Sequence, residues 1–165
     1  MLTRAAKLAF TLLVVALTLA AGWLFGMRNK GSFVVRAQRR VNKAVFNPTQ
    51  MQTAGRPGAY AAVVRHTGRT SGRTYETPVG AEPTDDGFVI ALVYGRESDW
   101  LKNVLAAESA TIVHEGREFE VDRPVVVPID TAIDEFPADS RGSLRLVGVT
   151  DCLRLRHVAP TRGDG

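Results

Sequence analysis

A run of 20 residues without a charged side chain near the start of the chain most constrains how it can fold. The run extends from Leu8 to Met27 and reads LAFTLLVVALTLAAGWLFGM. At 1.5 Å per residue, a helix of this length spans roughly 30 Å, the thickness of the hydrocarbon core of a bilayer. Trp23 lies near one end, where interfacial aromatic residues are common. We therefore expect residues 1–30 to form an N-terminal transmembrane helix that stands apart from the soluble fold.

The cations that flank this run predict its orientation. Arg4 and Lys7 precede it, and a larger group follows it: Arg28, Lys30, Arg36, Arg39, Arg40 and Lys43. The positive-inside rule then places the folded domain in the cytoplasm, on a single-pass anchor in the cell membrane. A cleaved signal peptide is the alternative, because Ala20-Ala21-Gly22 offers small residues for cleavage. A third possibility is a helix that lies in the interface without spanning it.

Residues 31–57 connect this segment to the soluble domain. Within them, residues 32–45 (SFVVRAQRRVNKAV) are either a basic amphipathic helix on lipid headgroups or a solvated linker. Breaker residues follow at Asn47-Pro48 and at 55–58 (GRPG). We therefore predict one folded domain over residues 58–160, which is long enough to bury one core.

The charge of the chain changes sign along its length. Residues 1–75 contain twelve Lys and Arg and no acid, whereas residues 76–165 contain nine Lys and Arg against seventeen Asp and Glu, a net charge of −8. Because most of the excess cations flank the apolar run, a lipid surface is favoured over nucleic acid as a partner. Cys152 is the only cysteine, so no intramolecular disulfide can form, and the three histidines have no metal-ligand spacing.

Short β-like segments separated by turn signals predict a mainly β fold. The expected strands cover residues 60–66, 74–81, 88–94, 110–114, 117–127 and 149–157. Residues 88–94 (FVIALVY) are apolar almost throughout, which indicates a strand covered on both faces. Ser98 is expected to cap a helix that ends near Ala107, and residues 131–136 to form a short helix. This pattern predicts a small antiparallel barrel with one inserted helix, a mainly β fold of the α+β class.

The loop between the first two predicted strands, residues 67–73 (TGRTSGR), has more hydrogen-bond donors than a hairpin needs. Glycines allow backbone N–H groups to approach an anion, and arginine side chains pair with phosphate in a bidentate way. Phosphate binding is one interpretation of this loop, and a solvated basic loop is the other.

A second stretch, residues 94–103 (YGRESDWLKN), leads from the end of a buried strand through a glycine turn into the capped helix. Trp100 and Asn103 are three residues apart and so share one helix face. Either both contact a ligand ring at the strand end, or Trp100 packs in the core and Asn103 caps the helix or faces solvent.

Together these stretches resemble the deazaflavin-dependent nitroreductase family, whose members have the split β-barrel of flavin reductases. That family carries a Gly-Arg-x-Ser-Gly-x loop, a proline a few residues later, a central strand and a Trp-x-x-Asn-Leu-like helix. Here the same order occurs as GRTSGR at 68–73, Thr77-Pro78, FVIALVY at 88–94 and WLKNVLAA at 100–107. The match extends from about Gly58 to Val127. The resemblance implies a split antiparallel β-barrel after the transmembrane helix, and a possible homodimer.

The resemblance also implies the coenzyme F420, a deazaflavin hydride carrier with a phosphate and an acidic tail. Carried over by position, the loop would hold the phosphate and tail, and the strand and helix residues would contact the ring. The implied coenzyme-binding residues are Arg69, Thr70, Ser71, Gly72 and Arg73 in the loop, Thr77 and Pro78 along the ring, Tyr94 and Gly95 at its edge, and Trp100 and Asn103 on the helix. The loop and the helix are therefore expected to lie side by side.

The implied reaction is hydride transfer from reduced F420 to a small-molecule quinone, nitro or enone-type acceptor. Tyr94 is the candidate for donating a proton or a hydrogen bond to the reduced acceptor. Family members that reduce nitro compounds usually carry several tyrosines in a later segment, whereas residues 131–146 contain none. A membrane anchor favours a lipid-soluble quinone. The alternatives are a split-barrel reductase that uses FMN or FAD, and a non-catalytic membrane-tethered module that binds a coenzyme.

Overall fold

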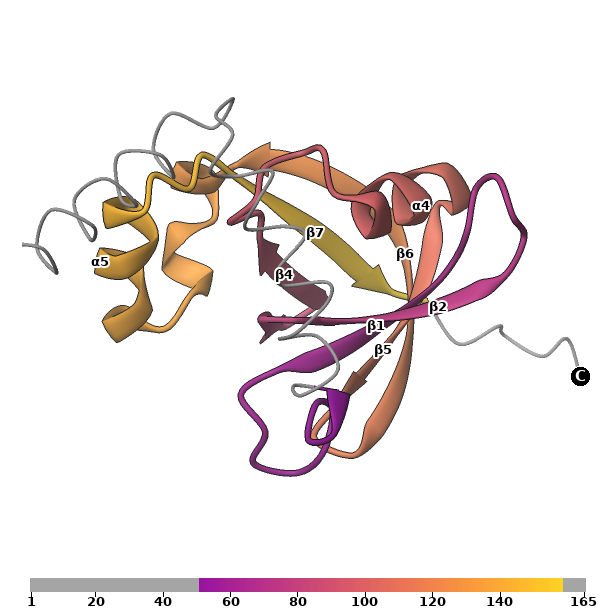
Figure 1. Ribbon diagram of the computed structural model, residues 1–165. Coiled ribbons are helices and arrows are strands. Elements are labelled where there is room, and N and C mark those ends of the chain that lie inside the picture. The colour runs from indigo at the N-terminus through magenta and orange to yellow at the C-terminus, as the bar shows by residue number, and fades with distance from the viewer. Residues whose placement is uncertain (1–50, 159–165) are drawn as a thin grey trace, which may run out of the picture.

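The computed structural model describes residues 51–158 (Figure 1). The predicted transmembrane helix over residues 1–30 and most of the basic linker lie outside the described residues. Within residues 51–158, no helix has the length and apolar character needed to cross a bilayer.

The described chain is built on one curled antiparallel sheet of seven strands in the order β2-β1-β5-β6-β7-β4-β3 (Figure 1). The strands are β1 (Ala62–Thr67), β2 (Thr74–Val79), β3 (Ala81–Thr84), β4 (Gly87–Ala91), β5 (Ser109–His114), β6 (Arg117–Pro128) and β7 (Asp151–His157). The predicted strand over 74–81 is in fact two strands, β2 and β3, which lie at opposite edges of the sheet. Because only Gly80 separates them, the sheet must curl until its two edges approach each other at that residue. The result is a half-barrel.

The inner face of the half-barrel carries the main core, which helix α4 (Asp99–Ala107) covers. Leu101 and Val104 of this helix are fully buried against inner-face residues such as Val64, Ile112 and Leu153. Ser98 occupies the N-cap position as predicted, although its side chain makes no capping hydrogen bond. The amphipathic spacing of α4 therefore fixes which side of the half-barrel is closed by a helix.

A second core lies on the other face of β4 and β7, beneath two 3-10 helices and helix α5 (Ala138–Leu146) (Figure 1). Phe88 and Ile90 point into the first core, whereas Val89 between them points into the second. This alternation confirms that the apolar run is covered on both faces, although β4 ends at Ala91, before the predicted Tyr94.

The helical content differs from the prediction in two places. The short helix expected over 131–136 is a pair of 3-10 helices, η2 (Ile129–Thr131) and η3 (Ile133–Glu135). In the described part of the chain that follows β1, two α-helices occur, α4 and α5, where the sequence predicted one inserted helix. No residue of α5 is buried, so the segment ADSRGSLRL lacks the apolar stripe by which a helix is recognised in a sequence.

Gly87 is required where β4 begins, because β7 passes directly above it. A Cβ at this position would lie 1.9 Å from the carbonyl oxygen of Leu155 and 2.8 Å from the Cα of Arg156. Both are backbone atoms of the interior strand β7 and cannot rotate away. We predict that Gly87→Ala lowers the free energy of unfolding by about 3 kcal/mol, as measured by urea unfolding.

Gly142→Ala is the matched control, since nothing lies within 4 Å of a Cβ at Gly142 in α5. There the same change is expected to be neutral or to stabilise the helix by about 1 kcal/mol. Equal effects at the two glycines would contradict the close packing of β4 on β7.

Candidate functional site

The loop of residues 68–73 between β1 and β2 is closed by its own backbone. The N–H of Gly68 donates to the carbonyl of Arg73, and the N–H of Gly72 donates to the carbonyl of Gly68, each over 2.8 Å. Gly72 has a φ of +65°, which favours glycine. A Cβ on Gly68 would lie 2.5 Å from Ser71 Oγ. The glycines therefore form a compact loop of defined shape.

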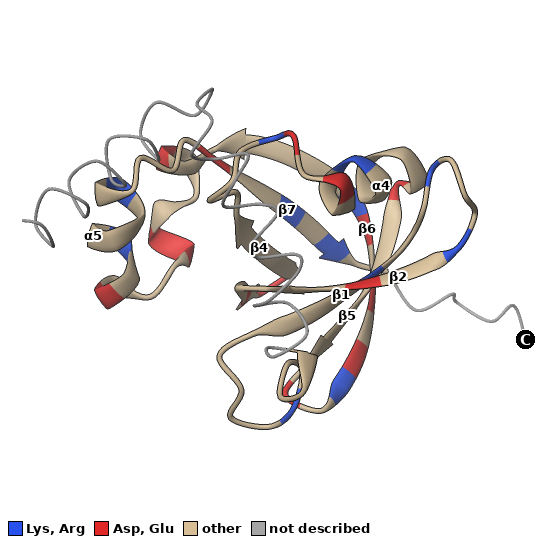
Figure 2. Ribbon diagram, viewed as in Figure 1, with Lys and Arg blue, Asp and Glu red and all other residues tan. Residues whose placement is uncertain are grey.

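Arg69 connects this loop to helix α4. Its backbone N–H and its Nη1 both donate to Oδ1 of Asn103, at 3.2 Å and 2.8 Å, and its Nη2 forms an ion pair with Asp99 Oδ1 at 3.2 Å. The prediction that the loop and the tryptophan-bearing helix lie side by side is confirmed. Figure 2 shows the basic positions of the loop beside α4. The guanidinium of Arg69 is bonded to the helix, and its predicted contact with phosphate is untested.

Two buried polar side chains continue this connection into the sheet. His66 and Asn103 are each only 5% exposed, and the Asn103 amide nitrogen lies 3.1 Å from His66 Nδ1. The other ring nitrogen of His66 lies 3.2 Å from the hydroxyl of Thr77 on β2. Burial lowers the pKa of His66, because the charged imidazolium loses its hydration there. A chain of hydrogen bonds therefore runs from Arg69 through Asn103 and His66 to Thr77.

The strand register explains which residues share this surface. Val64 pairs with Thr77, and His66 pairs with Tyr75, so these four side chains lie on the inner face of the half-barrel. The rings of His66 and Tyr75 stack at 5.9 Å between centroids. Pro78 lies on the opposite face from Thr77, because successive residues of a strand alternate. The side chains of Thr77 and Pro78 therefore lie on different faces of β2, and the contact of these residues with the coenzyme that the resemblance implies is untested.

The outer part of the loop carries donors that have no partner among the described residues. These are the backbone N–H groups of Thr70 and Ser71 and the exposed guanidinium of Arg73. The hydroxyl of Ser71 contacts the hydroxyl of Tyr75 at 3.1 Å and accepts a bond from the Arg73 N–H at 3.3 Å. This arrangement presents positive charge and N–H groups in the way that an anion is bound by proteins.

The second predicted stretch contributes a turn and a packed helix. Gly95, with a φ of +72°, donates its N–H to the Leu92 carbonyl at 2.8 Å. Tyr94 and Gly95 are half-buried in this turn. Trp100 is partly buried against the inner core. The structure thus agrees with a packing role for Trp100, and its other predicted role, contact with a ligand, is untested.

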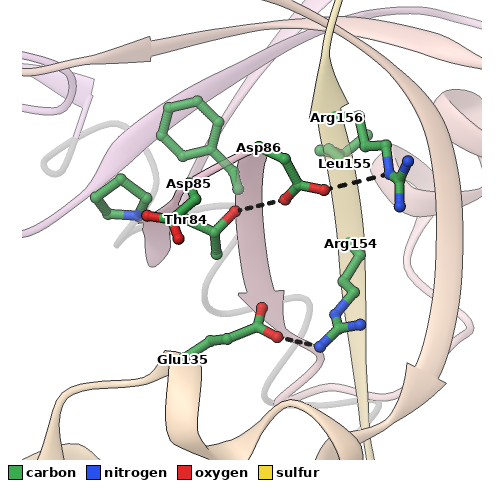
Figure 3. Close-up of a pocket in the computed structure, with 9 residues that line it drawn as sticks. Thr84, Asp85, Asp86, Glu135, Arg154, Leu155 and Arg156 are labelled. Atoms are coloured by element: carbon green, nitrogen blue, oxygen red, sulfur yellow. Dashed lines mark hydrogen bonds and ion pairs between the residues drawn. The ribbon is translucent and has the colours of Figure 1, made fainter.

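A cavity of about 600 Å³ lies away from these residues, between β4, β7 and the end of η3 (Figure 3). Four of its five charged side chains form ion pairs, Arg154 with Glu135 and Arg156 with Asp86. None of the residues predicted to bind the coenzyme lines this cavity. We therefore place the candidate site at the loop and α4 and not at this cavity.

Three residues of the candidate site were not predicted from the sequence: His66, Tyr75 and Asp99. In the sequence, His66 only adds to the basic region that precedes the loop and has no metal-ligand spacing, and its position in a predicted strand gives no sign of a buried partner. The two-residue period of the strands does place Tyr75 on the same face as Thr77, and this signal was available. The bond from Arg69 to Asp99 depends on how the helix docks, which no local pattern encodes.

Comparison with known proteins identifies a family for this chain. Residues 33–133 match a family model described as F420H(2)-dependent quinone reductase. A search of curated protein sequences found no match. Among solved structures, one described as an F420-H2 dependent reductase (FDR-A) is 10% identical, with a TM-score of 0.45, covering 59% of this chain and 94% of that one. Another, described as an F420 reductase, is 12% identical, with a TM-score of 0.41, covering 66% and 92%.

Asn103 is predicted to be the most sensitive polar residue of this region. Asn103→Ala removes the side-chain oxygen that accepts hydrogen bonds from two donors of Arg69. It also leaves a ring nitrogen of His66 buried without a partner. The expected loss in the free energy of unfolding is about 2–3 kcal/mol, measured by urea unfolding. The adjacent Lys102→Ala removes only an exposed pair with Glu97 and should cost less than about 1 kcal/mol. A loss at Asn103 no larger than at Lys102 would contradict the buried network.

Proposed function

Because the chain belongs to the F420H(2)-dependent quinone reductase family, and is thus an F420-dependent oxidoreductase, we propose that it delivers a hydride from reduced F420 to a quinone-type acceptor. The single observation that carries this proposal to particular residues is the loop of residues 68–73, fixed against α4 by Arg69 and Asn103. F420 supplies the hydride when it is bound. The protein supplies the binding surface and the orientation of the two reactants.

The residues present at the loop fit an anionic coenzyme. Arg73 is exposed and has no partner in the described part of the chain, and the N–H groups of Thr70 and Ser71 have no internal acceptor. A phosphate group satisfies such donors, and arginine pairs with it in a bidentate way. Because the loop is closed by backbone hydrogen bonds, the N–H groups of Thr70 and Ser71 are held in place before binding. Pre-organisation of this kind reduces the entropic cost of binding.

The contacts of Arg69 suggest a different role from that of Arg73. Both of its terminal nitrogens bond to α4 residues, so it holds the loop against the helix. We propose that Arg69 shapes the site and adds its positive charge, and that Arg73 makes the direct contact with phosphate. The remaining predicted contacts, from Thr77, Tyr94, Gly95 and Trp100 to the ring, are part of this proposal. Tyr94 remains the candidate proton or hydrogen-bond donor to the reduced acceptor.

An anchored enzyme suits a lipid-soluble acceptor. We propose that residues 8–27 anchor the chain in the cell membrane with the domain on the cytoplasmic side. We expect the full chain to stay in carbonate-washed membranes, and a chain that lacks residues 1–30 to be released or held only by salt-sensitive contacts. Protease added outside intact cells should leave the domain uncut. Release of the full chain by carbonate would refute the anchor.

Coenzyme titration tests the proposed function. The full chain should quench the fluorescence of F420 on binding, and FMN, which the comparisons do not support as the coenzyme, should not compete at equal concentration. Menaquinone added to the chain with reduced F420 should restore the absorbance of the oxidised coenzyme. Binding without oxidation by any quinone would favour the non-catalytic binding module and overturn the proposed reaction.

Arg73→Ala tests where the phosphate is bound. Loss of a charge-assisted contact predicts at least tenfold weaker binding of F420, roughly 1.4 kcal/mol, with little change for a deazaflavin core that lacks the phosphate. Arg145→Ala is the matched control, because it removes another exposed arginine, from α5. Equal losses for the two variants would indicate only long-range charge attraction and would move the phosphate site elsewhere.

A further inference from the structure

We infer that His66 is a positioning residue that holds the Thr77 hydroxyl as a hydrogen-bond donor toward an acceptor atom, such as a carbonyl oxygen, of the bound coenzyme. The inference rests on the proposed function, in which Thr77 contacts the deazaflavin. It follows from a sequence of donor and acceptor assignments that begins at Arg69 and ends at Thr77.

The orientation of the Asn103 amide is fixed by Arg69. The backbone N–H and the guanidinium of Arg69 both approach one Asn103 side-chain atom, at 3.2 Å and 2.8 Å. Both Arg69 groups can only donate, so the atom that they approach must be the amide oxygen. The amide nitrogen of Asn103 therefore faces His66, 3.1 Å from Nδ1. Chemistry thus removes the usual ambiguity between the two ends of an asparagine amide.

This orientation selects one tautomer of His66. Because the Asn103 amide nitrogen donates, Nδ1 of His66 must accept and carries no proton. A neutral imidazole then carries its proton on Nε2. That proton points to the hydroxyl oxygen of Thr77, 3.2 Å away. His66 is therefore the donor in this bond and Thr77 is the acceptor.

The tautomer of His66 determines how the Thr77 hydroxyl on β2 is oriented. Since the Thr77 oxygen accepts from His66, its own O–H proton must be donated elsewhere. No acceptor for that proton occurs among the described residues, and Thr77 is only half-buried. Its hydroxyl is thus held as a donor directed away from His66. A ligand that lies against β2 beside Thr77 gains from an acceptor at this position.

Protonation of His66 would break this arrangement. An imidazolium has N–H groups on both nitrogens, so Nδ1–H would face the Asn103 amide N–H. The groups around His66 are Tyr75 and Thr77 from β2 and Asn103 from α4, with Arg69 and Asp99 beyond Asn103. None of these groups places a carboxylate in contact with the ring. Burial lowers the pKa of His66 below its ordinary value of about 6.5. The neutral form is therefore kept at neutral pH.

A histidine whose pKa is lowered on folding contributes stability that is fully present above the unfolded pKa of about 6.5. That stability is lost as the pH falls from this value through the folded pKa. His66→Gln should remove this part of the pH dependence.

The direct test is the nitrogen chemical shifts of the histidine side chains in the full chain, without coenzyme, at pH 7. His66 is expected to show the Nε2–H tautomer and to stay neutral below pH 6.5. The chain has only three histidines, so His114→Gln and His157→Gln variants assign the signals. An Nδ1–H tautomer, or a His66 that is protonated at pH 6.5, would overturn the inference.

Coenzyme binding supplies the second test. Thr77→Val removes the hydroxyl but keeps the shape, and we expect about tenfold weaker binding of F420, whereas Thr77→Ser should stay within about threefold of the wild type. His66→Phe should weaken binding about as much as Thr77→Val, and the double variant should lose no more than either single one. His66→Gln keeps a donor near the Nε2 position and should bind better than His66→Asn, whose shorter side chain reaches only Asn103.

The outcomes separate this inference from the proposed function. If the wild type does not bind F420, the proposed function fails, while the nitrogen shifts still decide the state of His66. If the wild type binds and the losses of His66→Phe and Thr77→Val add, His66 does not act through Thr77 and the inference fails. Equal binding of His66→Gln and His66→Asn would lead to the same conclusion.

Discussion

Only Gly80 separates β2 from β3, although the two strands form opposite edges of a seven-stranded sheet. A flat sheet would hold these edges more than 20 Å apart, since neighbouring strands are about 4.8 Å apart. The two Cα–Cα steps from Val79 through Gly80 to Ala81 span at most about 7.6 Å. The sheet must therefore curl, and the curl creates an inner face that a single helix, α4, can cover. The candidate site exists because β1, β2 and α4 meet at the rim of this half-barrel.

The rim is held by polar contacts in a region where most neighbours are apolar. Asn103 lies on the same short helix as the fully buried Leu101 and Val104, and it is itself 95% buried. A buried amide without partners would cost several kcal/mol, and the Asn103 amide instead bonds to Arg69 and His66 on the two elements it must connect. Hydrophobic burial therefore attaches the helix to the sheet, whereas the hydrogen bonds set the position of the loop relative to the helix. Position at this level matters for hydride transfer, which is sensitive to small changes in the distance between reactants.

The position of the loop relative to α4 also decides where its positive charge is exposed. Arg69 and Arg73 are four residues apart in one loop, yet their surroundings differ. Arg69 lies over the first turn of α4, where Asp99 and the Asn103 oxygen pair with it. Arg73 lies where the loop joins β2, and its exposed side chain makes no hydrogen bond or ion pair with the described residues. One arginine thus contributes to the structure of the loop, and the other is available to an anion. The two arginines look equivalent in the sequence, but the fold gives them different surroundings.

The sequence by itself determined most of the strands, the position of α4, the strand covered on both faces and the family. These features depend on local patterns: a two-residue period, a helical period beginning at Ser98, an almost continuous apolar run, and the GRTSGR loop followed by Trp100 and Asn103. The sequence did not predict the break at Gly80, because an isolated glycine within TYETPVGAEPT also fits a bulge inside one long strand. It did not predict α5, whose residues are all at least partly exposed.

Only the tertiary structure decided which donors of the loop are used internally and which remain available. Whether Arg69 bonds to a helix or to a ligand depends on the distance between residues 30 or more positions apart, and no pattern within the loop carries that distance. The same is true of His66, whose tautomer depends on Asn103, 37 residues later in the chain. Local sequence fixes what a residue is able to bond to. The packing of distant segments fixes what it does bond to, because a hydrogen bond forms only when both partners are brought within about 3 Å.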